Sequence, residues 1–181
     1  MLTKPIRFAL ALLAATTAGS SAAEILDSDR GGFTVRNRVK VAAPRADVYR
    51  AAVMDIGRWW SDEHTVTGKA SNLYLEAVPQ GCFCERLGTG GGVVHLTVTF
   101  VNPAVMLRLT GGLGPLGLLG ASGNMLWEFD DADGGGTTVR WTYAVGGYSP
   151  DGLDAIAGAV DRVLGEQLER LKSLVENGDP G

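Results

Sequence analysis

The most constraining feature of the sequence is a long amphipathic segment near its C-terminal end. Ser149-Pro150-Asp151 is typical of a helix start, with a hydroxyl cap, a first-turn proline and an early acid. Asn177-Gly178 is typical of a helix stop. The pattern predicts a helix of about 24 residues, roughly 36 Å long, with one side buried. The buried stripe consists of Leu153, Ile156, Val160, Val163, Leu164, Leu168, Leu171, Leu174 and Val175.

Most of the chain before this helix reads as strands separated by turns. Residues 33–43 alternate between apolar and polar side chains, which predicts a half-buried strand. Six further strands are expected at 72–78, 82–87, 93–101, 104–110, 124–130 and 137–145. Together they predict an antiparallel meander with one dry and one solvated face.

A short helical stretch separates the first strand from the meander. Pro44 stands at its first-turn position, and apolar residues recur at helical spacing as far as Trp59. Gly57 is expected to break this stretch in two.

The first 23 residues read as a cleavable signal peptide. Lys4 and Arg7 precede an apolar run of about 11 residues, and Ser21 and Ala23 occupy the positions that signal peptidase reads. A membrane-spanning helix needs roughly 20 apolar residues, so no stable membrane anchor is expected. The alternative is a buried N-terminal core helix, but no polar face interrupts the run. We therefore expect a periplasmic or secreted protein.

The remaining chain divides into a short linker at 24–31, one domain at 32–176 and a tail at 177–181. Loss of Lys4 and Arg7 leaves 14 basic against 20 acidic residues, a net charge of −6. Because no basic cluster stands out, nucleic acid and anionic membrane surfaces are poor candidate partners.

The order of these elements resembles the helix-grip fold of the START-related superfamily, also called SRPBCC. That group includes the birch pollen allergen, polyketide cyclases and lipid-transfer domains. The resemblance covers residues 32–176 and implies an α+β fold, in which a curved antiparallel seven-stranded sheet wraps around the long C-terminal helix. Three phrases carry it, namely VRNRVKVAAPRADVYRAAVMDIGRWW, GCFCERL and GLDAIAGAVDRVLGEQLERLKSL.

A curved sheet gripped by one helix has more concave area than the helix covers, which predicts an internal cavity. Aromatic side chains on two expected strands should narrow that cavity without filling it. We therefore expect binding of a hydrophobic small molecule, such as a lipid, an isoprenoid or an aromatic metabolite. The candidate ligand-binding residues on these strands are Trp127, Phe129, Trp141 and Tyr143.

The phrase from Trp59-Trp60 to His64 is the most unusual in the chain. In the functional interpretation, this phrase forms one lip of the ligand pocket, with Trp59 or Trp60 stacked on the ligand and His64 as a polar contact. In the alternative interpretation, one tryptophan caps the core and the rest is a solvated loop. The glycine-rich run 111–123 is either an apolar gate or a long hairpin loop.

Glu85 shares a strand face with Phe83 and Leu87. If that face points inward, burial would raise the pKa of Glu85, which could then act as a general acid or anchor a polar ligand group. The opposite face, with Cys82 and Cys84, could equally be the buried one. His95 is expected on the solvated face, in a surface or inter-strand hydrogen bond.

The two cysteines are either free thiols or a strained, easily reduced bridge. No metal site is expected, because the chain has only two histidines and no paired ligand spacing. No cofactor is expected either.

Three functions compete. The first is an exported carrier or sensor of a hydrophobic small molecule. The second is an enzyme of the polyketide cyclase or dehydratase type, with Glu85, His64 and Tyr143 as the only plausible acid–base groups. The third is a protein-interaction module resembling the heat-shock-ATPase activators. The sequence specifies neither the ligand nor the oligomeric state.

Overall fold

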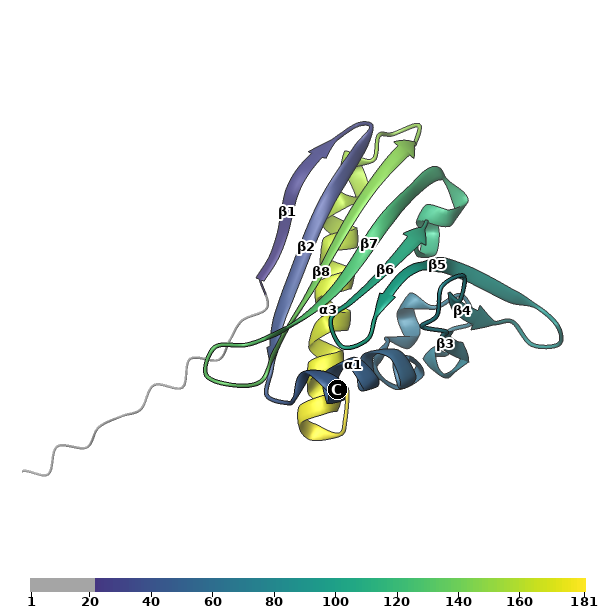
Figure 1. Ribbon diagram of the computed structural model, residues 1–181. Helices are drawn as coiled ribbons and strands as arrows, with labels where there is room; N and C mark the ends of the chain where they lie inside the picture. Colours follow the sequence, from purple (N-terminus) through teal and green to yellow (C-terminus); the bar gives the residue numbers. More distant parts are fainter. Residues whose placement is uncertain (1–21) are drawn as a thin grey trace, which may run out of the picture.

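A computed structural model describes residues 22–181, so the expectations for residues 1–21 lie outside it. Figure 1 shows a single curved sheet with the long helix α3 (Asp154–Asn177) lying against it. The expected α+β class, with a curved antiparallel sheet and a long C-terminal helix, is confirmed.

The sheet has eight strands in the order β1-β2-β8-β7-β6-β5-β4-β3, and every neighbouring pair is antiparallel. The sheet is open, with β1 and β3 at its edges. From β2 the chain crosses to the far edge and returns as a meander that ends beside β2. The strands are β1 Ala22–Asp29, β2 Gly32–Val41, β3 Leu73–Leu75, β4 Cys82–Arg86, β5 Gly92–Asn102, β6 Met106–Gly111, β7 Gly120–Asp131 and β8 Thr137–Tyr148.

The eighth strand, β1, is the one that the sequence did not predict. Residues 24–31, expected to be a linker, form most of β1 and the turn into β2. The β1 side chains from residue 24 onward are all exposed, so they carry no alternation of apolar and polar positions. Only backbone pairing with β2 defines this edge strand.

The helical crossover consists of α1 (Arg45–Met54) and α2 (Ile56–Trp59), with Pro44 at the N-cap of α1. The break lies at Asp55, not at Gly57 as expected. Asp55 leaves the helical conformation (φ −109°, ψ 20°), whereas Gly57 lies inside α2. A Cβ at Gly57 would lie 3.0 Å from the Ala70 carbonyl oxygen, so the glycine permits close packing against η2 (Ala70–Asn72).

Helix α3 has the predicted length of about 24 residues and begins at Asp154, so the Ser149-Pro150-Asp151 signal lies just before the helix and does not cap it. It ends at Gly178, whose left-handed φ of 78° lets its N–H donate to the Leu174 carbonyl. Its buried face packs against β1 and β2 and against α1 and α2. The core therefore lies between the sheet and these helices.

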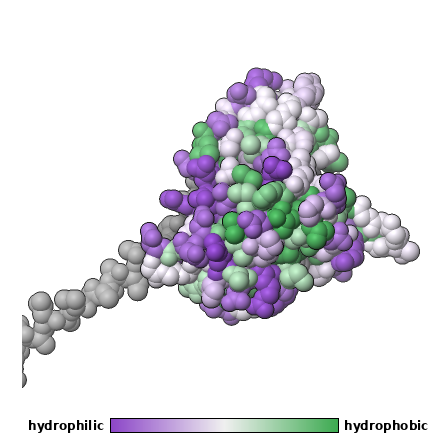
Figure 2. All heavy atoms as spheres, in the orientation of Figure 1, coloured by the Kyte–Doolittle hydropathy of each residue, from purple (hydrophilic) through white to green (hydrophobic). Residues whose placement is uncertain are grey.

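The outer surface is mixed. Figure 2 shows apolar side chains gathered near the middle of one face, with hydrophilic ones along its left and lower margins. The most exposed large apolar residue is Leu118, at 90 %, in the 3-10 helix η3 (Gly114–Leu118) within the glycine-rich run.

Candidate functional site

The interior of the protein is an aromatic cluster that contains all four tryptophans of the chain. Trp127 on β7 and Trp141 on β8 are directly paired, and their rings stack with centroids 4.6 Å apart and an interplanar angle of 16°. Trp59 lies within about 6 Å of both rings, and Trp60 stacks on Trp141 at 6.4 Å. All four side chains are at most 3 % exposed. They fill the space in which the sequence predicted a cavity.

Three buried polar atoms in this cluster have no hydrogen-bond partner within the described residues. They are the indole Nε1 of Trp127, the indole Nε1 of Trp141 and the Oδ1 of Asn37. Their residues form one row across β2, β8 and β7, since Asn37 pairs with Trp141 and Trp141 pairs with Trp127. Buried polar atoms without partners are uncommon, because each costs about 1–3 kcal/mol.

Asn37 is a site residue that sequence reasoning missed. It is fully buried, and its Nδ2 donates to the carboxylate (2.9 Å) and the carbonyl oxygen (3.2 Å) of Asp161 on α3. The signal was present in β2. Phe33, Val35, Val39 and Val41 occupy the dry face, and Asn37 is the one polar residue in that row.

Of the other predicted ligand-binding residues, Phe129 and Tyr143 are also fully buried. Phe129 makes an edge-on contact with Tyr49 at 5.4 Å. The Tyr143 hydroxyl donates to the Gly111 carbonyl (2.7 Å) and accepts from the Leu113 N–H (3.1 Å). Burial raises the pKa of Tyr143 to about 12, although the Leu113 N–H acts in the opposite direction. Tyr143 therefore fastens the glycine-rich run to the sheet.

Both tryptophans of the predicted lip are buried, whereas Asp62 and Glu63, further along the same phrase, are exposed. Trp59 Nε1 donates to the Ala51 carbonyl at 3.2 Å, and Trp60 Nε1 donates to the His64 carbonyl at 3.0 Å. The Trp59 carbonyl in turn accepts from Arg170 Nε at 2.9 Å. The lip is thus fixed to α1 and α3 by hydrogen bonds as well as by packing.

The segment after the tryptophans is also joined to α3. The buried Gln167 accepts a hydrogen bond from the Ser61 N–H at 2.7 Å. His64 is half-buried, and its Nε2 lies 3.5 Å from Glu166 Oε2. The His64 side chain therefore faces α3 at the surface, while its backbone carbonyl accepts the hydrogen bond from Trp60.

Glu85 points inward and is fully buried. Its Oε1 accepts from the Thr67 N–H at 2.6 Å, and its Oε2 accepts from the Val66 N–H at 2.9 Å. His95 Nε2 lies 3.0 Å from the same Oε2. The pair therefore joins β4 and β5 to the segment that follows the lip.

His95 was expected on the solvated face, and this expectation is wrong. Phe83 pairs with Leu96 while the next residue, Cys84, pairs with Val94, so β5 carries one extra residue, His95, at this point. Such a bulge shifts the alternation of side chains by one position. His95 and Leu96 are consequently both buried, at 6 % and 1 % exposure.

The expected rise in the pKa of Glu85 is also corrected. Burial alone would raise it, but the hydrogen bonds from Thr67, Val66 and His95 outweigh burial and lower the pKa below its usual value. Glu85 is therefore an ionised structural anchor at neutral pH. His64 and Tyr143 are engaged with other partners, so the structure brings together none of the three groups named for catalysis.

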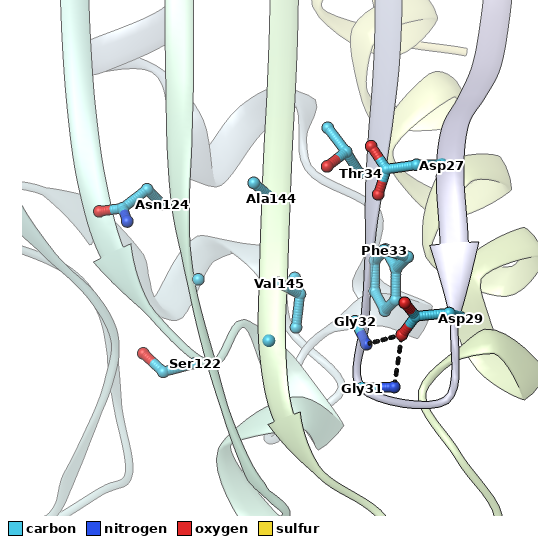
Figure 3. Close-up of a pocket in the computed structure, with 12 residues that line it drawn as sticks. Asp27, Asp29, Gly31, Gly32, Phe33, Thr34, Ser122, Asn124, Ala144 and Val145 are labelled. Carbon is cyan, nitrogen blue, oxygen red and sulfur yellow. Dashed lines mark hydrogen bonds between the residues drawn. The ribbon is translucent and has the colours of Figure 1, made fainter.

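Two hollows in residues 22–181 lie elsewhere. A groove of about 610 Å³ lies on the sheet face opposite the tryptophans, where Asp27, Thr34, Ser122 and Asn124 surround it (Figure 3). A second hollow, of about 260 Å³, lies beside α2. Neither is lined by any of the predicted ligand-binding residues.

Cys82 and Cys84 form a disulfide, which decides between the two alternatives for these residues. Among residues 22–181, no group of three or more His, Cys, Asp or Glu side chains is placed to hold a metal ion. Within the same residues, no helix is both long enough and apolar enough to cross a membrane.

Solved structures with the same fold have low sequence identity to this chain. A conserved protein of unknown function from Enterococcus faecalis has a TM-score of 0.60 at 11 % identity, covering 87 % of this chain and 78 % of its own. DynU16, a protein in the dynemicin biosynthetic locus, has a TM-score of 0.55 at 20 % identity, with coverages of 81 % and 48 %. Ara h 8.0201 has a TM-score of 0.54 at 16 % identity, with coverages of 80 % and 98 %. At these identities the likeness shows the fold alone.

Among curated proteins, none matches the chain in sequence. The sequence profile of one family matches residues 32–176, which is most of the chain and the whole domain expected from the sequence. The match agrees with the observed architecture of an open antiparallel sheet against a long C-terminal helix. The chain belongs to the polyketide cyclase/dehydrase and lipid transport family, within the SRPBCC superfamily.

Proposed function

We propose that the protein binds a hydrophobic small molecule between the concave face of its sheet and α3, as an exported carrier or sensor. One observation carries this proposal: the row of unpartnered polar atoms formed by Asn37, Trp141 and Trp127 inside an otherwise apolar interior. Two indole N–H groups are donors and the Asn37 Oδ1 is an acceptor. A ligand that supplies a complementary oxygen or hydroxyl would satisfy atoms that the protein leaves unpaired.

The shape of the ligand follows from the stacked rings. Trp127 and Trp141 present flat faces, which favour an aromatic or fused-ring molecule over a flexible chain. Burial of 200–300 Å² of apolar ligand surface is worth on the order of 5–7 kcal/mol before the costs of binding. That estimate corresponds to micromolar affinity at best.

Ligand entry requires a rearrangement, because the aromatic side chains fill the interior. We expect Trp60 to move, since it stacks on Trp141 and its indole hydrogen bond goes to the His64 carbonyl within the same segment. Its displacement would expose the Trp127–Trp141 stack while the hydrogen bond between Arg170 and the Trp59 carbonyl keeps the lip attached to α3. The proposed ligand therefore replaces Trp60 on the stack.

The cyclase alternative lacks a free acid–base pair among the groups named for it. Glu85 is ionised and bound to two backbone N–H groups and His95. The Tyr143 hydroxyl is used by the glycine-rich run, and His64 faces Glu166. This arrangement supports binding in preference to acid–base chemistry by these residues.

Native mass spectrometry of the purified protein, together with titration of 1-anilinonaphthalene-8-sulfonate, tests the proposed site. We expect saturable binding that quenches tryptophan fluorescence, weakened about tenfold by Trp141→Phe through loss of one donor and part of the stack. Asn124→Ala, in the outer groove, is the matched control and should leave binding unchanged. Absence of both a copurifying molecule and saturable probe binding would contradict the proposal, as would binding that only Asn124→Ala abolishes.

Export is part of the proposal and rests on the signal-like pattern in residues 1–23. N-terminal sequencing of protein recovered from the periplasmic or secreted fraction of the producing cells should give Glu24 as the first residue. Strand β1 begins at Ala22, so cleavage there would remove only its first two residues and keep most of its pairing with β2. An intact N-terminus on the folded protein would refute export by cleavage.

A further inference from the structure

The disulfide on β4 joins two residues that have only Phe83 between them. Cys82 and Cys84 have Cα atoms 5.4 Å apart, and both side chains lie on the strand face opposite the buried Phe83 and Glu85. Cys82 is half-buried, whereas Cys84 is 4 % exposed. A reagent that approaches from solvent therefore meets Cys82 first.

This bridge contributes little to holding the fold together. It closes a loop of three residues, so it removes little conformational entropy from the unfolded chain. β4 is already paired with β3 on one side and β5 on the other. Phe83 is 1 % exposed and packs edge-on against Trp60 at 5.1 Å. The strand thus has a backbone ladder and a core anchor that do not depend on the disulfide.

A fixed positive charge lies on the same face of β4. Arg86 follows Cys84 by two residues, and its guanidinium lies 4.1 Å above the centroid of the Tyr74 ring. Tyr74 is the residue directly opposite Cys84 in the β3–β4 pairing. The stacked guanidinium therefore lies over the residue that pairs with Cys84, where its positive charge stabilises negative charge that develops on the Cys84 sulfur when the bridge opens.

We propose that Cys82–Cys84 is a thiol–disulfide exchange site for small-molecule or protein thiols. An incoming thiolate attacks Sγ of Cys82 to form a mixed disulfide, and Sγ of Cys84 leaves with the electron pair of the broken bond. A second reductant thiolate then attacks the reductant-derived sulfur of the mixed disulfide. Sγ of Cys82 leaves with the electron pair of that bond and takes up a proton. Two external thiols are oxidised to a disulfide while the bridge gains two electrons, and the reverse steps restore it.

The surroundings assign different roles to the two sulfurs. Cys82 is the sulfur that is attacked, because it is the more accessible of the pair. Cys84 is the leaving group, because Arg86 is positioned beside it. This proposal concerns the outer face of β4 and does not depend on ligand binding in the tryptophan interior.

The first test uses the full-length, folded, oxidised protein in glutathione redox buffers without denaturant. Free thiols are trapped with a maleimide and counted by intact mass, and thermal unfolding is followed by circular dichroism before and after reduction. We expect both thiols to appear at millimolar reduced glutathione, with a melting temperature that changes by only a few degrees. A bridge that opens only once the protein unfolds overturns the proposal.

Two single-cysteine variants test the assigned roles. Cys84→Ser leaves the accessible Cys82, which should form a mixed disulfide with oxidised glutathione at least tenfold faster than the buried Cys84 left by Cys82→Ser. Equal rates, or a faster Cys84, would contradict the assignment. In the chain that keeps both cysteines, Arg86→Gln should slow reduction of the bridge several-fold, while Arg86→Lys should retain most of the rate. These two variants keep both cysteines, so they remain informative if a serine variant fails to fold.

Discussion

Replacement of Glu85 by glutamine tests the buried polar cluster that joins β4 to the segment after the lip. The carboxylate accepts from the N–H groups of Val66 and Thr67 and contacts His95 Nε2 at 3.0 Å. Glutamine has nearly the same shape, but it offers one acceptor oxygen, and its amide nitrogen is a donor. One of the two backbone N–H groups would therefore face another donor and lose its partner.

The expected loss of stability can be worked out from these contacts. An unsatisfied buried donor costs about 1–3 kcal/mol, and a hydrogen bond to a charged group is worth about 1.5–3 kcal/mol. The two estimates overlap at Glu85, because the same two carboxylate oxygens accept all of these hydrogen bonds. We therefore expect Glu85→Gln to lower the free energy of unfolding by about 2–4 kcal/mol. For a domain of this size, that loss lowers the melting temperature by roughly 5–15 °C.

The effect of Glu85→Gln should also depend on pH. Burial acts to raise the pKa of Glu85, but the hydrogen bonds from Thr67, Val66 and His95 lower it overall. A carboxylate with a depressed folded-state pKa contributes its full stability above the unfolded-state pKa, about 4.3. That contribution is lost as the pH falls through the lower folded-state value. The difference in stability between wild type and Glu85→Gln should therefore narrow below about pH 4.

Urea unfolding, followed by tryptophan fluorescence and circular dichroism between pH 3 and pH 7, measures both effects. Glu128→Gln is the matched control, because Glu128 pairs with Arg140 at 2.9 Å in a partly exposed position. Loss of such a pair should cost under about 1 kcal/mol. The reasoning is refuted if Glu85→Gln costs no more than Glu128→Gln at pH 7, or if its deficit stays constant down to pH 3.

Three smaller predictions follow from single contacts. Tyr143→Phe should cost about 1–2 kcal/mol and increase hydrogen exchange in the glycine-rich run, and in a spectrophotometric titration Tyr143 should ionise near pH 12. Gln167→Leu leaves the Ser61 N–H without its acceptor, so chemical denaturation should show a loss of about 1–3 kcal/mol. Gly123→Ala places a methyl group against the β8 backbone and should cost about 1–3 kcal/mol in the same assay, whereas an unchanged midpoint would contradict the close approach.

The predictable parts of the fold are those in which apolar side chains recur at a regular spacing without interruption. β7 and β8 alternate over their central residues, and Trp127 and Trp141 fall on the buried face as expected. The apolar stripe of α3 predicted its length, and its leucines are buried as expected, whereas Ile156, Val160, Val163 and Val175 are only half-buried. In each case burial on one face imposes the pattern, so the pattern reveals the face.

The parts that were missed are those in which no local pattern carries the information. β1 is exposed throughout the part whose side chains are described, so only its pairing with β2 defines it. The burial of His95 depends on a bulge, and the alternation of β5 gives no sign of one. The break at Asp55 depends on how α2 packs against η2, a tertiary contact. Asn37 differs, because its polar side chain in the dry row of β2 was visible in the sequence.

Membership of the family and the filled interior together constrain how the proposed ligand binds. A purely apolar molecule that displaces Trp60 from Trp141 exchanges one aromatic contact for another, and it also exposes a large indole to water. Binding of such a molecule therefore gains little free energy relative to the ligand-free, closed protein. A molecule that also meets the Trp127 and Trp141 N–H groups and the Asn37 oxygen satisfies atoms that remain unpaired in the closed form. Since each such atom is worth about 1–3 kcal/mol, hydrogen bonding decides whether the open, ligand-bound form is favoured. The specificity of the proposed site would thus lie in the few polar atoms of an apolar interior.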